Sequence, residues 1–322
     1  MYDLRRLQIL RELHRRGTLS AVAAALSYST SAISQQLSQL ESEVGVPLLE
    51  PDGRRVRLTA QARILVAHAE TILNQLEKAR SDIAASMDVV SGALRVAGFQ
   101  TAALNLLPEA IAWITRTYPG IEVLLTQAEP DEAIPGVLAR EFDLAIVESF
   151  PGQPLVQSGA TERHLLFEDA MRLGISVSDP RARRGLLLEQ FARDPWIMEP
   201  TGTPAREWAV DVCRKAGFEP RVQYESPDMF VHQRFASQGL ALAFLPDLMW
   251  ANTTPGVALH LLRPGMARTV YTVVRSGAGG HPVIRAFHDA LMIALKGATS
   301  TVLRSLESVA GPADHSNLDP DR

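Results

Sequence analysis

The chain of 322 residues contains a single cysteine, and no apolar run approaches the roughly 20 residues that are needed to cross a bilayer. One cysteine cannot form an internal disulfide, which agrees with a reducing compartment. Residues 1–17 carry Arg and Glu through their apolar positions and lack the uninterrupted apolar stretch of a secretory signal. We therefore expect a cytoplasmic protein that has no membrane partner.

Motifs for metal binding, phosphate binding and nucleophilic catalysis are also missing. The eight histidines show no metal-ligand spacing. Cys213 continues an apolar stripe with Ala209 and Val212, which favours a buried hydrophobic role over a nucleophilic one. Gly277–Gly280 lacks the lysine of a phosphate loop and is typical of a loop that enters a helix. We predict no enzyme activity, no metal and no cofactor.

Composition and charge indicate a folded protein of two or three domains. Hydrophobic residues make up 46% and charged residues 21%, which is ordinary globular usage. A net charge of −4 by itself argues against nucleic-acid binding. Residues 1–60, however, hold eight arginines against six acidic residues, so the positive charge is concentrated at this end.

Three amphipathic segments occupy the first 45 residues. Leucines recur every three residues from Leu4 to Leu13 and predict a helix that ends at Gly17, and Thr18 can cap a second helix. A third helix is predicted over 29–44, with Ile33 and Leu37 on its apolar side. The opposite side carries short hydroxyl and amide groups that can reach base edges and phosphates in the major groove: Ser29, Thr30, Ser31, Ser34, Gln35 and Ser38.

A basic hairpin follows the third helix. A turn at Pro51–Gly53 lies between two short apolar strands, and Arg54, Arg55 and Arg57 come directly after it. Arginines at such a wing face the phosphate backbone or the minor groove. Each feature alone also fits a solvated helix face or a surface strand. Their order and spacing together predict a winged helix-turn-helix DNA-binding domain over residues 1–60.

Residues 18–59 resemble the DNA-binding domain of LysR-type transcriptional regulators. The matching segments are Ala24–Leu26, Ser31–Ser34, Leu40-Glu41, Leu48-Leu49 and Arg54–Thr59. This sequence departs from the family at Thr30, where Gln is frequent, at Pro51, where Arg is frequent, and at Gln61-Ala62, where Ala-Gly is usual. The first two departures can change the preferred operator and the phosphate contacts.

A heptad pattern follows the wing. Apolar residues from Leu58 to Ile83 alternate in steps of four and three, which favours helix pairing over a single connector lying on its own domain, the alternative interpretation. We expect a linker helix over 59–90, ended by Ser91-Gly92, and a dimer seam that includes Leu65, Ile72, Leu76 and Ile83. Pairing predicts a pseudo-palindromic operator. The family resemblance implies dimerisation through such a helix, in a dimer or a tetramer.

Strands and helices alternate between residues 93 and 297, which predicts a parallel α/β sheet in two lobes. The resemblance implies a two-lobed effector domain like that of periplasmic solute-binding proteins. Lobe I would comprise about 93–164 and 267–297, and lobe II about 165–266. Residues 298–322 are expected to be a polar tail that is disordered from about Gly311.

Ligands of open α/β sheets bind beyond the carboxyl ends of strands. Gln100 and Thr101 open a helix after one strand, and Thr201, Gly202 and Thr203 precede a helix in the other lobe. Glu148 and Phe244 stand at further strand ends. We predict that these seven residues bind the effector, although the threonines also fit ordinary helix caps. Glu148 in the cleft would disfavour a carboxylate effector or select a cationic or hydroxylated one.

The sequence thus predicts a transcriptional regulator that binds double-stranded DNA, a small-molecule effector and a second copy of itself, with RNA polymerase as a further candidate partner. The alternative is a helix-turn-helix protein whose C-terminal domain is an effector-independent assembly or catalytic module.

Overall fold

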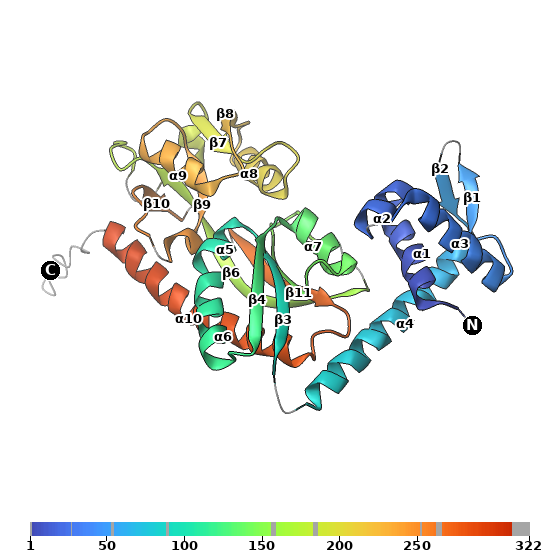
Figure 1. The fold of residues 1–322 in the computed structure, drawn as a ribbon. Coiled ribbons are helices and arrows are strands. Elements are labelled where there is room, and N and C mark those ends of the chain that lie inside the picture. The colour runs from blue at the N-terminus through green and yellow to red at the C-terminus, as the bar shows by residue number, and fades with distance from the viewer. Residues whose placement is uncertain are drawn as a thin grey trace, which may run out of the picture.

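The computed structural model describes residues 2–26, 28–52, 55–87, 90–155, 159–182, 186–251, 253–261 and 266–310 (Figure 1). Its N-terminal part contains the predicted helices and hairpin: α1 (Leu4–Arg16), α2 (Leu19–Ala25), α3 (Thr30–Val44), β1 (Leu49–Asp52) and β2 (Arg55–Leu58). Thr18 caps α2, accepting from the Ala21 N–H at 3.2 Å, and Gly17 ends α1 at φ 73°. The apolar sides of the three helices close one core around Leu10, Ile33 and Leu37.

Helix α4 (Ala60–Ala85) leads from this domain to the rest of the chain (Figure 1). The predicted end at Ser91-Gly92 is wrong, because the helix ends at Ala85. The Ser86 hydroxyl donates to the Ile83 carbonyl at 2.7 Å, and such a local bond competes with continued helix.

The C-terminal part is built on one sheet of seven strands. Along the sheet the order is β10–β6–β11–β5–β3–β4, and β9 pairs with β6. β3 (Gly92–Gly98) lies parallel to β4 (Ile121–Gln127) and β5 (Leu144–Ser149), whereas β11 (Ala267–Arg275) lies antiparallel to β5 and β6. The predicted parallel sheet is therefore right for β3, β4 and β5 and wrong for β6 and β11. The chain enters β11 from the second lobe without a crossover helix, and antiparallel pairing needs none.

Strand β6 (Thr161–Ile175) runs through both lobes. Its first part pairs with β11, and its last part pairs with β9 (Ala243–Pro246) and β10 (Ala258–His260). The apolar pattern does not show the full length of this strand, because charged residues such as Glu168 and Asp169 interrupt it. The chain passes between the lobes at β6 and again between β10 and β11.

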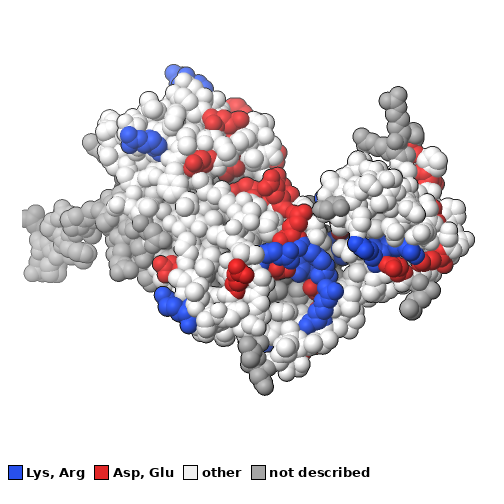
Figure 2. All heavy atoms as spheres, in the orientation of Figure 1, with Lys and Arg blue, Asp and Glu red and all other residues white. Residues whose placement is uncertain are grey.

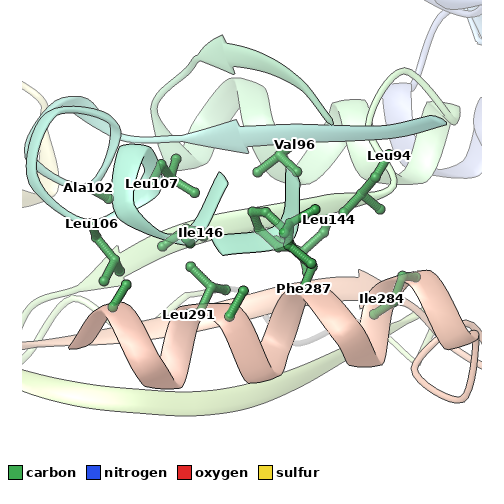
Figure 3. Packing of buried hydrophobic residues seen from close by; sticks show 14 of the residues in the cluster. Leu94, Val96, Ala102, Leu106, Leu107, Leu144, Ile146, Ile284, Phe287 and Leu291 are labelled. Carbon is green, nitrogen blue, oxygen red and sulfur yellow. The ribbon is translucent and has the colours of Figure 1, made fainter. Parts of the chain in front are cut away.

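Lobe I, as we use the term, comprises β3, β4, β5, β11, the first part of β6 and their helices: α5 (Gln100–Asn105), α6 (Leu107–Thr117), α7 (Pro130–Ala139) and α10 (Pro282–Ala310). Side chains alternate across the sheet, so Val96 packs on the face covered by α10 and Ala97 on the face covered by α7. Figure 3 shows Ile284, Phe287 and Leu291 of α10 against the first face.

Lobe II comprises the rest of the sheet and a parallel pair of strands, β7 (Pro195–Met198) and β8 (Arg221–Glu225). Its helices are α8 (Pro204–Lys215), α9 (Met229–Ser237) and the short η1 (Leu188–Phe191) and η2 (Asp247–Trp250). Its core is aromatic: the Phe244 ring lies 5.2 Å from the rings of both Trp196 and Trp208. Cys213 is fully buried beside them, and burial raises its pKa to about 12, so its predicted hydrophobic role is confirmed.

Helix α10 continues to Ala310, so the first part of the predicted polar tail, residues 298–310, is helical. The disorder predicted from Gly311 falls on residues outside those described. Among the residues that the structure describes, none forms a helix long and apolar enough to cross a membrane.

Candidate DNA-binding and effector-binding sites

Helix α3 presents a polar face to solvent. Its apolar residues Ile33, Leu37 and Leu40 are completely buried in the domain core, and this fixes the orientation of the helix. All six residues of the predicted reading face are exposed: Ser29, Thr30, Ser31, Ser34, Gln35 and Ser38. Ser29 also caps the helix by accepting from the Ala32 N–H at 3.1 Å. The face is uncharged and made of short donors and acceptors, as contact with base edges requires.

Glu41 connects this helix to the wing. Its carboxylate accepts from the backbone N–H groups of Leu48 and Leu49 at 2.8 and 3.0 Å, which fixes the turn before β1. In the hairpin, Arg57 pairs with Glu50 at 2.8 Å and stays exposed. The predictions for Arg54 and for the Arg55 side chain fall outside the described residues, although the Arg55 backbone opens β2.

The predicted seam on α4 is divided between two faces of the helix. Ala62 and Ala69 pack with Val66 against the core of the helix's own domain, and Leu73 is buried further along α4. Of the four residues predicted for dimerisation, Leu65 is partly buried and also packs against this core. Leu76 is partly buried, Ile72 is 42% exposed and Ile83 is 65% exposed.

The far half of α4 docks on lobe I through a buried carboxylate. Glu77 is bonded by the guanidinium of Arg140 and lies 3.4 Å from that of Arg275, and these cations hold the pKa of Glu77 low against the opposing effect of burial. The Ser81 hydroxyl donates to the Gly277 carbonyl at 2.9 Å. A Cβ on Gly277 would meet the Asn74 carbonyl oxygen at 2.5 Å, so glycine allows this close approach. The linker helix is thus fixed to lobe I.

A buried arginine organises the region where the lobes meet. Arg268 of β11 stands directly opposite Asp169 of β6 in the strand register, and its Nε donates to that carboxylate at 2.9 Å. It also bonds Glu148 at the end of β5, and its Nη2 donates to the Thr101 hydroxyl at 2.6 Å. Arg268 is 3% exposed. Every polar edge of the guanidinium therefore has a protein partner.

Several buried carboxylates lie around the single positive charge of Arg268. Burial raises the pKa of Glu148 to about 8, and the charge of Arg268 only partly opposes this. Burial also raises the pKa of Glu199 to about 7, with repulsion from Glu129 as the next cause. Burial likewise raises the pKa of Glu129.

The predicted residue Gln100 joins the two lobes. Its amide Nε2 donates to Asp228 at 2.9 Å, and its Oε1 accepts from the Met229 N–H at 2.9 Å. Asp228 and Met229 begin α9 in lobe II, whereas Gln100 begins α5 in lobe I. These two bonds connect lobe I to lobe II.

The lobe II residues of the prediction lie at the start of α8. Thr203 caps this helix, accepting from the Arg206 N–H at 3.2 Å. Thr201 is exposed and lies 3.4 Å from Glu225, and Gly202 is exposed at φ 92°. Phe244 is buried in the lobe II core and lines a small cavity between the lobes.

That cavity is the candidate effector site. Most of its wall comes from lobe II, and Arg268 lines it from β11 of lobe I; the lining includes Phe150, Met198, Glu199, Trp208, Phe244 and Arg268. Sequence reasoning missed Arg268, Asp169 and Glu199. A charged residue inside an apolar strand, as in the segments FEDAM and MARTV, was the available signal. No group of three or more metal-ligating side chains occurs within the described ranges.

Two family models match this chain. Residues 4–63 match the bacterial regulatory helix-turn-helix protein, lysR family, and residues 88–296 match the LysR substrate binding domain. The transcriptional dual regulator GltC of Bacillus subtilis is 31% identical over 272 residues, covering 83% of this chain and 89% of that protein.

Solved structures show the same fold. HinK, a LysR family transcriptional regulator from Pseudomonas aeruginosa, superposes with a TM-score of 0.55 at 20% identity, covering 91% of this chain and 98% of HinK. Full-length CbnR in complex with its target DNA superposes with a TM-score of 0.53 at 21% identity, covering 91% of this chain and all of CbnR.

A winged helix-turn-helix domain joined by a long helix to a two-lobed binding domain defines a DNA-binding transcriptional regulator with a C-terminal effector domain. The chain belongs to the LysR family of such regulators. The resemblance seen in residues 18–59 is confirmed and extends over most of the chain.

Proposed function

We propose that this regulator reads a pseudo-palindromic operator as a dimer or tetramer, and that a small molecule bound between the lobes changes the placement of its paired DNA-binding domains. The observation that carries the proposal is the exposed polar face of α3, set opposite a fully buried apolar side. In this proposal Ser29, Thr30, Ser31, Ser34, Gln35 and Ser38 contact bases and phosphates, and Arg54, Arg55 and Arg57 contact the backbone.

Strand β11 connects the candidate effector cavity with the linker helix, and it can therefore transmit a change in the effector domain to the DNA-binding domain. At its start Arg268 lines the cavity, and at its end Arg275 lies 3.4 Å from Glu77 of the linker helix. An effector that prefers one arrangement of the lobes can bias the orientation of α4 through this strand. Gln100, Thr101, Glu148, Thr201, Gly202, Thr203 and Phe244 remain the proposed effector contacts, and Arg268 and Glu199 join them.

Pairing through Leu65, Ile72, Leu76 and Ile83 would present two reading helices at once. We propose the division expected from the sequence: residues 1–60 bind DNA, 59–90 link and pair, and 93–297 bind the effector. The relatives that match are transcriptional regulators, and we propose that this chain likewise has no catalytic activity. It would act in the cytoplasm, where bacterial operators lie, with RNA polymerase as a further partner.

The wing assignment is tested by Arg54→Ala/Arg55→Ala. Because phosphate contacts release counterions, the variant should bind all DNA sequences more weakly, and its slope of log affinity against log salt should fall by about 1 per arginine. Gel shifts over a salt series measure both quantities. Arg214→Ala/Lys215→Ala, which removes two exposed charges from lobe II, is the matched control. An unchanged salt slope in the wing variant would refute the assignment.

A further inference from the structure

The cavity between the lobes has an aromatic and methionine-rich wall. Phe150 and Trp208 lie 5.5 Å apart between ring centroids, and Trp208 and Phe244 lie 5.2 Å apart. All three rings line the cavity, as do Met198 and Met229. Aromatic faces attract cations, and a desolvated contact of this kind is stronger than an exposed one. The wall therefore suits a ligand that carries a positive charge on a compact apolar group.

Carboxylates outnumber cations around this cavity. Glu129, Asp169 and Glu199 each act on Glu148 by charge repulsion, and Arg268 is the guanidinium that opposes them. Arg268 is already bonded to both Glu148 and Asp169. An anionic ligand would have to displace these carboxylates and would still meet the remaining negative charge.

Glu199 is the carboxylate that lines the cavity itself. Its pKa is raised to about 7, mainly by burial and then by Glu129, so its ionised form lacks a sufficient counter-charge. A cation placed beside it would supply that charge. Figure 2 shows further acidic side chains gathered on the surface between lobe II and α7, where the lobes face each other. That field would favour the approach of a cation.

We propose that the effector is a small organic cation, a protonated amine or a quaternary ammonium, whose charged group lies against Glu199 and the aromatic wall. The inference rests on the proposed function, in which the effector binds between the lobes. Arg268 then acts as the internal counter-ion of Glu148 and Asp169 and does not bind the ligand's charge.

The test compares probes that share a shape but differ in charge. Calorimetry and thermal shift on the full-length protein would use choline, its uncharged carbon isostere dimethylbutanol, tetramethylammonium, a series of primary amines and diamines, and acetate and benzoate. We expect cations to bind, and the best of them to bind at least tenfold more tightly than its uncharged isostere. Glu199→Gln, which keeps the shape, should weaken that cation at least tenfold, whereas the exposed Glu219→Gln should not.

The pH dependence gives an independent readout with a probe of fixed charge. Tetramethylammonium should bind more tightly as the pH rises from about 6 to about 8.5, because Glu199 must be ionised to attract it. Other titratable or charged groups face this carboxylate or the cavity from neighbouring elements: Glu129, Glu148, Asp169, His232 and Arg268. Burial lowers the pKa of His232, which favours its neutral form. Glu199→Gln should make the profile shallower and leave the smaller dependence that comes from Glu148, whose pKa is about 8.

The outcomes separate this inference from the proposed function. Ala205→Phe places a ring in the cavity and serves as a blocking variant. If carboxylates bind, cations do not, and Ala205→Phe abolishes the binding, the cation inference is overturned and the effector site stands. If no cation of the panel binds, the inference is likewise overturned. If cations bind but neither Glu199→Gln nor Ala205→Phe affects them, both this inference and the proposed location of the effector are wrong.

Discussion

Replacement of Arg268 by methionine should destabilise the effector domain by about 3–5 kcal/mol, the range observed when one partner of a buried ion pair is removed. Methionine fills much of the volume of the arginine stem, so the loss would come from charge and not from a cavity. Glu148 and Asp169 would remain buried, with side chains 9% and 2% exposed, and without their counter-ion. Denaturant titration followed by tryptophan fluorescence measures the free energy of unfolding.

The pH dependence of that loss has a definite sign. A carboxyl whose pKa is raised on folding binds more protons in the folded state, so stability falls as the pH rises between the unfolded value and the folded value. For Glu148 this window runs from its ordinary value of 4.5 up to about 8. Without Arg268 this pH dependence should become larger, so the free energy of unfolding of the variant should be higher at about pH 5 than at pH 8.

Two further variants complete this experiment. Arg214→Met, at an exposed pair with Glu219, should leave the denaturation midpoint nearly unchanged. Arg268→Met/Asp169→Leu should be more stable than Arg268→Met alone, because one uncompensated charge is gone. A loss that is equal at both pH values, and is not relieved by Asp169→Leu, would contradict the role given to Arg268.

Ile72→Glu should convert the regulator to a monomer and lower its affinity for a two-half-site operator by about 10²- to 10⁴-fold, the gain that linking two binding events provides. Ile72 is 42% exposed in the single chain, so the substitution should leave the fold of the protomer intact. In a paired seam it would face its own copy across the axis and bury two carboxylates. Light scattering gives the mass, and gel shifts give the affinity.

Thr71→Glu is the matched control, since it introduces the same residue one position earlier, on a solvent-exposed part of α4. It should leave both the mass and the affinity nearly unchanged. If Ile72→Glu remained dimeric and bound the operator like the unmodified protein, pairing through this seam would be excluded.

Elements with local signals could be predicted from the sequence. The start of helix α8 was predicted, because Thr203 caps it and Pro204 opens it within one continuous segment. The reading face of α3 was predicted correctly as exposed, because a strong apolar stripe determines which side of a short helix is buried.

Features that depend on distant residues could not be predicted. Arg268 meets Asp169, Glu148 and Thr101 across separations of 99, 120 and 167 residues, and no local pattern records such a meeting. The charged residues also prevented the prediction of the full length of β6, because a charged residue within an apolar run is taken as the end of a strand when strands are predicted from alternation. The heptad pattern of α4 did not show which of its apolar residues pack on the helix's own domain, as Ala62 and Ala69 do.

The central claim is that the exposed face of α3 reads the sequence of a two-part operator. The most direct measurement is a footprint of the full-length protein on the DNA flanking its own gene, with Gln35→Ala compared on specific and on random DNA. We predict two protected half-sites whose centres lie about one helical turn, or a multiple of it, apart. We further predict that Gln35→Ala lowers specific affinity while leaving non-specific affinity unchanged. A lack of sequence-dependent protection, or an equal loss on both DNAs, would contradict the account.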